Sequence, residues 1–332
     1  MVRIEASRMT EFSSRETFHK QLGSVVSGLN QLEKRWFNKP LTPEEKYVEL
    51  HKFGQSIFRG SGQNNKIKDP ERLLFANVFN LFSFKHRLTE EDRTLSELQT
   101  IFKKGKIIGF LGPLGVGKST LAEWTAIETS NRLATIEPYK KNPFWNAQQK
   151  EPKKYDEFML RSQVFFLLFN ISADIRSDIA RRVTERTMIS DTSILTDILM
   201  WVEWYRQNNR FDEKEYKTYL KLVNLFKDII PRPDLLVVVN ADSSEHLHEA
   251  VNNRSIDDKE RCGEAIFTEE ELQLQMNITQ QLLEKTLPHD WKTRTFTLTV
   301  NPLEFDPRNL NQEYLDKQIK LITEEMERVR VL

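Results

Sequence analysis

A glycine-rich segment near residue 112 constrains the fold of this chain more than any other feature. It reads Gly112-Pro113-Leu114-Gly115-Val116-Gly117-Lys118-Ser119-Thr120 and fits the pattern G-x-x-x-x-G-K-[ST]. The apolar run before it, residues 106–111, predicts a short buried strand, and residues 120–126 after it predict the start of a helix. Strand, glycine loop and helix are the context in which this pattern binds phosphate.

The residue types in this loop suit a nucleotide. Gly112 and Gly117 allow a tight turn that aims backbone amides at phosphate oxygens, and the helix N-terminus adds its positive end. We expect Lys118 to lie on the β- and γ-phosphates and the Ser119 hydroxyl to reach Mg²⁺. The sequence therefore predicts ATP with Mg²⁺, and residues 112–120 as the phosphate site.

Composition limits the remaining classes of function. The 332 residues carry 49 Lys and Arg and 49 Asp and Glu, which gives no electrostatic reason to expect a nucleic acid polymer. The single cysteine, Cys262, excludes an internal disulfide and suits a reducing compartment, so we expect a cytoplasmic protein. No apolar run approaches the roughly 18 residues of a membrane span, and the N-terminus is too polar for a signal peptide.

The chain divides near residue 104 into two parts. Residues 1–104 contain no convincing strand and predict an all-helical extension of unknown role. Its helices are expected over residues 16–37, after Thr42-Pro43, after Asp69-Pro70 and over residues 88–103. In the third helix, Leu73, Leu74, Val78 and Phe79 fall on one face. Residues 105–332 form the second part, which we expect to carry a complete nucleotide site.

From residue 105 onward, strand-like and helical segments alternate, as in a parallel sheet covered on both faces. Five strands are predicted, at residues 106–111, 133–137, 187–191, 234–240 and 294–300. Functional side chains in such sheets gather at the C-terminal ends of the strands. That edge would bring Glu137 and Asp191 beside the phosphate loop. Two carboxylates there suit phosphoryl transfer to a hydroxyl, one as the base and one at the metal.

Further segments, in order, resemble the deoxynucleoside kinase family over about residues 105–325. Glu137-Pro138 with Asn142-Pro143-Phe144 is similar to its E-P…N-P-[YF] stretch, and residues 191–197 resemble its [DE]-R-S-I-x-x-D segment. Residues 231–235 resemble its P-x-P-D-L strand entry, and residues 303–306 its acidic turn near the donor adenine, which Asp306 would contact. The resemblance implies a P-loop kinase fold: an α/β domain with a parallel five-stranded sheet flanked by helices, preceded here by the helical extension.

The resemblance also implies roles for single residues. Glu137 would be the general base on the 5′-hydroxyl of a nucleoside, and Asp191 would work with Ser119 at Mg²⁺. Gln163 would hydrogen-bond the nucleobase, because a side-chain amide offers one donor and one acceptor to a base edge. From the residues alone, Gln163 fits a solvated helix position equally well.

The phosphates need more positive charge than one lysine supplies. Arg254 and Arg261 resemble the family's arginine lid over them, with an exposed charged loop as the alternative. The chain departs from the family at Thr192, which replaces an arginine, and at Gln149, which replaces a sugar-binding tyrosine. Three arginines near Thr192 in sequence could substitute for the missing one: Arg181, Arg182 and Arg186.

Two classes of function stay open. One is an ATP-dependent kinase acting on the 5′-hydroxyl of a (deoxy)nucleoside or similar small acceptor. The other is a nucleotide-binding regulator on a kinase fold that has lost phosphoryl transfer and acts through residues 1–104 on a protein partner. Trp201 and Trp204 form an aromatic stripe that suits core packing or a homodimer contact.

Overall fold

A computed structural model describes most of the chain. The described residues are 12–39, 41–59, 69–98, 105–129, 132–136, 139–150, 155–184, 186–191, 193–285 and 295–331. Glu137, Pro138 and Thr192, as well as the side chain of Gln149, lie outside the described part.

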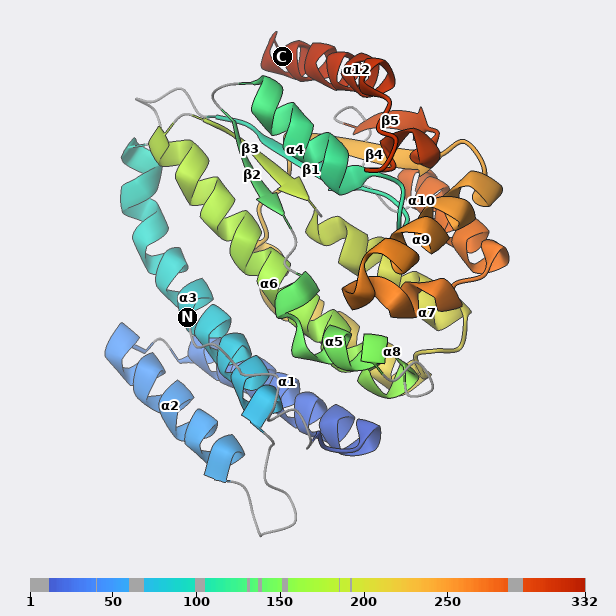
Figure 1. Cartoon of the computed structure of the whole chain (residues 1–332). Helices are drawn as coiled ribbons and strands as arrows, with labels where there is room; N and C mark the ends of the chain where they lie inside the picture. Colours follow the sequence, from blue (N-terminus) through green and yellow to red (C-terminus); the bar gives the residue numbers. More distant parts are fainter. Residues whose placement is uncertain are drawn as a thin grey trace.

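A parallel five-stranded sheet forms the centre of the α/β part (Figure 1). Its strands are β1 (Ile107–Leu111), β2 (Arg132–Ile136), β3 (Thr187–Asp191), β4 (Leu235–Ala241) and β5 (Thr295–Val300). Their order across the sheet is β2-β3-β1-β4-β5, and every neighbouring pair is parallel. All five predicted strands are present within two residues of the expected bounds, and the predicted fold class is confirmed.

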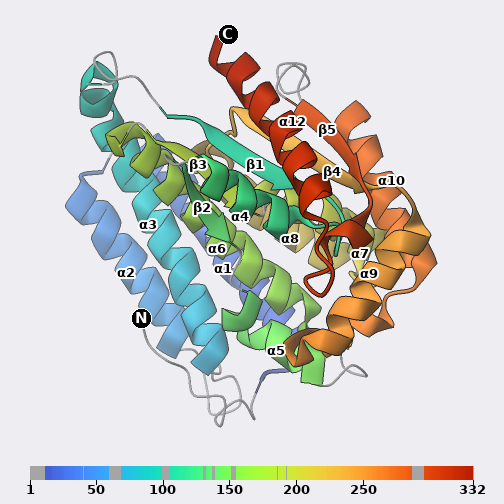
Figure 2. The same ribbon diagram turned by 45° about the horizontal axis from the view of Figure 1, so that its top comes forward.

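Helices cover the sheet on both faces. On one face, α4 (Lys118–Glu128) packs against β1, β2 and β3, and α12 (Gln312–Val331) packs against β4, β5 and α4 (Figures 1 and 2). On the other face, α6 (Tyr155–Thr184) contacts β1 and β3, and α10 (Glu269–Lys285) contacts β4. This covering explains why β1 is buried along its whole length and reads as a continuous apolar run.

Shorter elements connect these layers. The remaining helices of this part are α5 (Pro143–Lys150), α7 (Val202–Gln207), α8 (Glu213–Phe226) and α9 (Ser244–Asp257). Single turns of 3₁₀ helix are Tyr139–Lys141, Lys227–Ile229 and Pro302–Phe305, and a longer 3₁₀ segment is Lys259–Ile266. A π-helix, Thr196–Trp201, follows β3 and runs directly into α7.

The expectation that no apolar run is long enough to span a membrane is wrong for helix α6. Its stretch Asp156–Arg182 is long and apolar enough, by length and composition, to cross a bilayer. Within the described residues it is the single helix that meets this test, and 83% of its most apolar window is buried inside the protein. Because the sheet and other helices surround it, α6 is a core helix.

The extension is helical, as predicted. It contains α1 (Arg15–Asn38), α2 (Pro43–Arg59) and α3 (Asp69–Leu98). The predicted separate helix over residues 88–103 is wrong, because α3 continues without a break to Leu98; no glycine or proline interrupts it after its first turn. Leu73 is also misplaced by the sequence pattern: it is 45% exposed, whereas Leu74, Phe75 and Val78 are buried.

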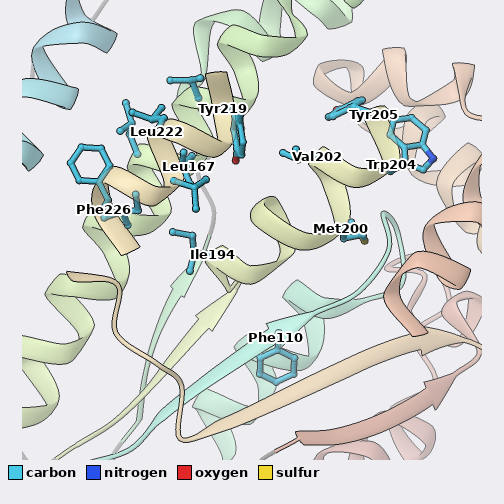
Figure 3. Packing of buried hydrophobic residues seen from close by; sticks show 14 of the residues in the cluster. Phe110, Leu167, Ile194, Met200, Val202, Trp204, Tyr205, Tyr219, Leu222 and Phe226 are labelled. Atoms are coloured by element: carbon cyan, nitrogen blue, oxygen red, sulfur yellow. The ribbon is translucent and has the colours of Figure 1, made fainter. Parts of the chain in front are cut away.

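The extension and the α/β part share one hydrophobic core. Helix α1 contacts α6 and α8, and α3 contacts the same two helices. Figure 3 shows the middle of this core, where Leu167 of α6 lies near Tyr219, Leu222 and Phe226 of α8. The same cluster of buried side chains continues to Phe18 of α1. That residues 105–332 alone carry a complete nucleotide site stays a prediction.

Candidate functional site

The phosphate loop lies between β1 and α4, as its pattern predicts. Gly115 and Gly117 have φ angles of 79° and 94°, a left-handed region that favours glycine. A Cβ on Gly112 would lie 2.1 Å from the Val239 carbonyl oxygen of β4, so the loop touches the neighbouring strand at a point that only glycine allows. The glycines are therefore required by the backbone path of this loop.

Two side chains, Lys118 and Gln275, hold the loop in its observed shape. The Lys118 ammonium donates to the carbonyl oxygens of Gly112, at 2.9 Å, and Pro113, at 2.6 Å. The Leu114 amide donates to Oε1 of the buried Gln275 in α10, at 3.0 Å. Lys118 thus lies across the loop, and α10 braces its far side. The sequence reasoning missed Gln275, because no local pattern links residues so far apart along the chain.

A cleft of about 340 Å³ opens in front of this loop. It is bounded by the loop, by α9, by the segment after α9 and by the turn after β5. Eight of the predicted site residues line it: Gly115, Gly117, Lys118, Ser119, Thr120, Arg254, Arg261 and Asp306. Four others, Gly112, Pro113, Leu114 and Val116, are buried within the loop itself.

Both lid arginines bind one buried carboxylate. Glu264 is fully buried; its Oε2 accepts from Arg254 Nε at 2.9 Å and its Oε1 accepts from Arg261 Nη1 at 3.1 Å. Burial lowers the pKa of the Arg254 guanidinium, although the Glu264 carboxylate raises it. The alternative of an exposed charged loop is therefore wrong for these two side chains. The sequence reasoning missed Glu264; its spacing of three residues from Arg261 and ten from Arg254 was the available signal.

The lid is tied to the segment that follows β2. The Arg261 guanidinium stacks 3.7 Å from the centre of the Tyr139 ring. The Tyr139 hydroxyl donates to Asp258 Oδ2 at 2.9 Å. Tyr139 comes two residues after Glu137, the expected general base, so the lid contacts a residue that is near Glu137 in sequence.

The carboxyl ends of β2 and β3 are adjacent. Asp191, the last residue of β3, is buried and pairs in register with Ile136, the last residue of β2. The Ser193 amide donates to the Phe110 carbonyl of β1 at 2.8 Å, which brings the turn after β3 next to the strand that enters the phosphate loop. Glu137 follows Ile136 directly in the sequence, and its own placement is outside the described residues.

Gln163 is buried beside a second cavity, of about 60 Å³. Its Nε2 donates to the Tyr205 hydroxyl at 3.3 Å, whereas its Oε1 has no hydrogen-bond partner among the described residues. The indole nitrogen of Trp145, on the same cavity, is likewise buried without a partner in the described part of the chain. The alternative of a solvated helix position is therefore wrong for Gln163.

The aromatic stripe after β3 belongs to the core. Trp204 and Tyr205 are buried, and Trp204 packs against Phe267 with ring centres 5.4 Å apart. Trp201 lines the second cavity together with Asp197, which accepts from Asn170 of α6 at 2.6 Å. Both Asp197 and Trp201 belong to the π-helix, a type of helix often found at functional sites.

The three arginines near Thr192 in sequence cannot replace the missing one. Arg181 donates to the Gly105 carbonyl at 3.2 Å and to Asp234 at 3.3 Å, which places it at the amino ends of β1 and β4. Arg182 pairs with Asp178, one helical turn earlier in α6. Arg186 immediately precedes β3 and is exposed. Since the phosphate loop is at the carboxyl ends of the strands, these side chains lie at the opposite edge of the sheet.

Two carboxyl groups near the site have shifted pKa values. A hydrogen bond from Arg308 lowers the pKa of Asp306, and Arg308 also reaches Asp257 at the end of α9, at 3.2 Å. Burial raises the pKa of Asp174 to about 7. Asp174 lies on α6 and accepts from the Ser190 hydroxyl, next to Asp191, at 2.7 Å.

Comparison with known proteins identifies the family. The model of the deoxynucleoside kinase family matches residues 108–285, more than half of the chain. The chain belongs to the deoxynucleoside kinase family. The matched range contains the phosphate loop, Gln163 and both lid arginines, and it begins after the extension.

Solved structures of M. mycoides deoxyadenosine kinase are similar to this chain. The form with bound dCTP is 18% identical, with a TM-score of 0.47, over 67% of this chain and 98% of that one. The form with bound dATP is 20% identical, with a TM-score of 0.47, over 67% of this chain and 99% of that one. No curated protein matches this chain.

Proposed function

We propose that this protein is an ATP-dependent kinase that phosphorylates the 5′-hydroxyl of a (deoxy)nucleoside or a similar small acceptor. The observation that carries the proposal is the meeting of two cavities at one arginine. Arg261 lines both the cleft in front of the phosphate loop and the smaller cavity that contains Gln163. A phosphate donor bound in the larger cleft and a nucleoside bound in the smaller cavity would have their reacting atoms close together beside this guanidinium.

The larger cleft fits a nucleoside triphosphate. Its glycine loop leads into the N-terminus of α4, where backbone amides and the helix end favour phosphate oxygens. On binding, Lys118 would exchange its two loop carbonyls for phosphate oxygens, and Arg254 and Arg261 would add positive charge from the other wall.

The oxygen donors near the loop fit Mg²⁺. This ion usually takes one or two protein carboxylates together with the substrate phosphates. The Ser119 hydroxyl and the Asp191 carboxylate are hard oxygen donors of that kind. Among the described residues, no group of three or more His, Cys, Asp or Glu is placed to hold a metal by itself. Bound there, Mg²⁺ would neutralise charge on the phosphates.

The smaller cavity would receive the nucleobase of the acceptor. Gln163 Oε1 is an acceptor without a partner in the described structure, and it would take a hydrogen bond from a base edge. Glu137, which follows the strand beside Asp191, would accept the proton of the 5′-hydroxyl as the phosphoryl group arrives.

A second candidate function is a nucleotide-binding regulator without phosphoryl transfer. One observation favours it: a cavity of about 60 Å³ holds only about four waters at roughly 15 Å³ of probe volume each, less than a nucleoside needs. For catalysis the aromatic walls, Trp145 and Trp201, must move apart. In the regulator they would stay closed.

Replacement of Glu137 by Gln separates the two functions. If Glu137 is the base, ATP binding is retained and turnover falls by about 10²–10⁴-fold. The matched control is Glu123→Gln, which changes an exposed carboxylate on α4 and is expected to leave turnover unchanged. The assay pairs an ATP titration by calorimetry with phosphorylation of a panel of deoxynucleosides. Wild-type protein that binds ATP and phosphorylates none of them supports the regulator.

A further inference from the structure

Residues at the start of the described chain reach into the acceptor half of the site. The Phe12 ring packs 5.4 Å from Phe144 of α5 and 5.1 Å from Phe158 of α6, measured between ring centres. Phe144 precedes Trp145, which lines the smaller cavity. A segment remote in sequence thus wedges between the two helices that form one wall of this cavity.

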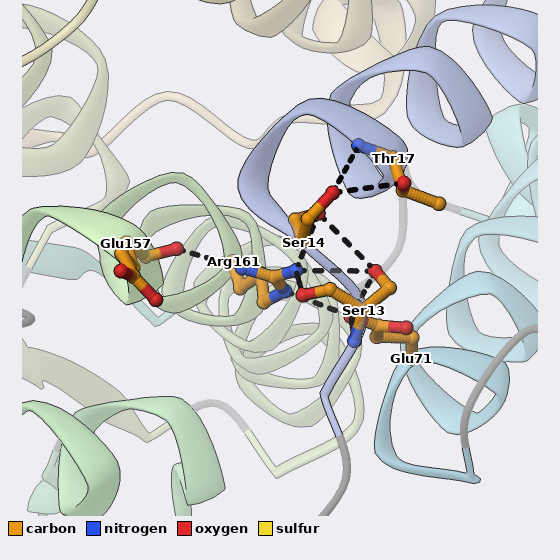
Figure 4. A network of polar contacts seen from close by, with 6 residues as sticks. All are labelled: Ser13, Ser14, Thr17, Glu71, Glu157 and Arg161. Carbon is orange, nitrogen blue, oxygen red and sulfur yellow. Dashed lines mark hydrogen bonds and ion pairs between the residues drawn. The ribbon is translucent and has the colours of Figure 1, made fainter.

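A buried ion pair fixes the same segment (Figure 4). Arg161 of α6 and Glu71 of α3 are both almost fully buried, and Arg161 Nε donates to Glu71 Oε1 at 2.8 Å. The Ser13 hydroxyl donates to the same carboxylate oxygen at 2.8 Å, and Arg161 Nη2 donates to the Ser14 carbonyl at 3.1 Å. The guanidinium therefore binds both the N-terminal segment and α3, and this holds Phe12 in place.

Three successive residues of α6 connect this anchor to the acceptor cavity. Arg161 binds the extension, and Gln163 lines the cavity. Between them, the Ser162 hydroxyl accepts from Asn142 Nδ2 at 3.0 Å. Asn142 Oδ1 in turn accepts from the amide of Trp145 at 3.2 Å and so caps α5. A shift of α6 at Arg161 would displace both Gln163 and Trp145.

We propose that the N-terminal segment Phe12–Ser14, anchored by Glu71 and Arg161, is a positioning element for the acceptor cavity. It sets the distance between α5 and α6 and thereby the placement of Gln163 and Trp145. The proposal rests on the proposed function, since it assigns the smaller cavity to the acceptor. It gives the helical extension a role in acceptor binding and none in ATP binding, because the residues that line the larger cleft all fall between 115 and 307.

The test uses three variants of the full chain. Phe12→Ala removes the wedge and leaves the ion pair intact, and Phe12→Leu keeps most of the apolar volume. Glu33→Gln is the matched control: it breaks an ion pair of the same extension, with Lys85, which retains its bond to the Leu225 carbonyl. Glu33 lies about 27 Å along α1 from Arg15 at 1.5 Å per residue, far from the acceptor cavity.

Steady-state kinetics with ATP and a panel of four 2′-deoxynucleosides give the first result. Phe12→Ala is expected to raise the acceptor KM about tenfold and to leave the ATP KM within twofold. Phe12→Leu and Glu33→Gln are expected to leave both constants within twofold. Equal changes in the two KM values, or the same acceptor defect in Glu33→Gln, would mean that the segment merely supports the fold, and would overturn the proposal.

Hydrogen exchange without ligand distinguishes failure of this proposal from failure of the proposed function. If no nucleoside is phosphorylated by the wild type, the proposed kinase activity fails, yet exchange still tests the wedge. Phe12→Ala is expected to speed exchange of amides in residues 142–150 and 155–165 at least fivefold, whereas Glu33→Gln leaves them unchanged. Unchanged exchange there in Phe12→Ala would overturn the positioning role.

Discussion

The replacement of Gly117 by Ala tests the phosphate loop by two separate physical effects. The first is backbone strain. Gly117 has a φ of 94°, and a left-handed conformation costs an alanine about 1–2 kcal/mol relative to glycine. Because the residue directly precedes α4, relief of this strain would rotate the first amides of the helix away from the cleft.

The second effect is a collision with Phe305. The new Cβ would lie 2.4 Å from Phe305 Cδ2, whereas carbon atoms in contact are separated by about 3.5–4.0 Å. Phe305 is buried against Tyr314, so its ring must move by about 1 Å or more within a packed environment. Overpacking of this kind costs about 1–3 kcal/mol. The two effects together lower the free energy of unfolding by about 2–5 kcal/mol.

Thermal unfolding measures both stability and binding. For 332 residues, an unfolding entropy of about 2.1 cal/mol/K per residue amounts to about 0.7 kcal/mol/K. Gly117→Ala is therefore expected to lower the Tm by about 3–7 °C. In wild-type protein, ATP with Mg²⁺ at 100 times its Kd contributes about 2.7 kcal/mol, a rise of about 4 °C. In the variant this rise is expected to disappear.

Gly23→Ala is the matched control. Gly23 lies within α1, its φ is not positive, and a Cβ there would have no atom within 4 Å. The change is expected to stabilise the helix by about 0.5–1 kcal/mol and to leave the rise with ATP intact. If Gly117→Ala lowered the Tm and yet kept the full rise with ATP, the loop would not be the phosphate site.

Four further outcomes are expected. Lys118→Ala abolishes the Tm rise with ATP and lowers the Tm without nucleotide by no more than about 3 °C, because this half-buried side chain contributes two hydrogen bonds of about 1 kcal/mol each. Glu264→Gln removes the carboxylate that Arg254 and Arg261 share, although Arg261 keeps Asp258 at 3.7 Å. Stability is expected to fall by about 3 kcal/mol, the lower end for a buried pair, since both guanidinium groups are partly in water; urea unfolding measures the loss. The Asp174 carboxyl has a pKa of about 7 in the folded protein against 3.8 ordinarily, so between these pH values the folded state binds one proton that the unfolded state has lost. The free energy of unfolding is therefore expected to fall by up to about 4 kcal/mol as the pH rises from about 4 to 7. Urea unfolding measures this fall, which is expected to be absent in Asp174→Asn. A fragment of residues 98–332 retains every residue that lines the larger cleft but aggregates or melts at least 10 °C lower in a thermal scan. Unchanged stability would show that the extension is dispensable for the fold.

The glycine loop could be predicted from sequence because its parts are consecutive. The glycine loop, the strand before it and the helix after it occupy about twenty successive residues, and the geometry of each follows from local rules. Arg254, Arg261 and Asp306 were placed through the family pattern, and all three line the cleft.

The partners of these residues could not be predicted in the same way. Glu264 neutralises two arginines, and Gln275 braces the loop from 161 residues away. The spacing of Glu264 from the two arginines hints at a pairing but does not separate a solvated position from a buried one, and Gln275 has no local signal at all. The expectation that Arg181, Arg182 or Arg186 could replace the arginine missing at Thr192 failed for a related reason. Nearness in sequence says nothing about which end of a parallel strand a side chain reaches.

The burial of α6 explains why the extension and the α/β part share one core. Between Phe158 and Ile175 no residue of this helix is exposed, so it has no solvent face along five turns. A helix without a solvent-facing stripe must be covered on every side. The sheet covers one side, and α5 and α8 cover part of the rest. An ordinary amphipathic helix at this position could have left its outer face in water. The burial of this stretch therefore needs a further layer, and α1 with α3 contribute to it. For this reason we expect the extension to be a structural part of the α/β domain.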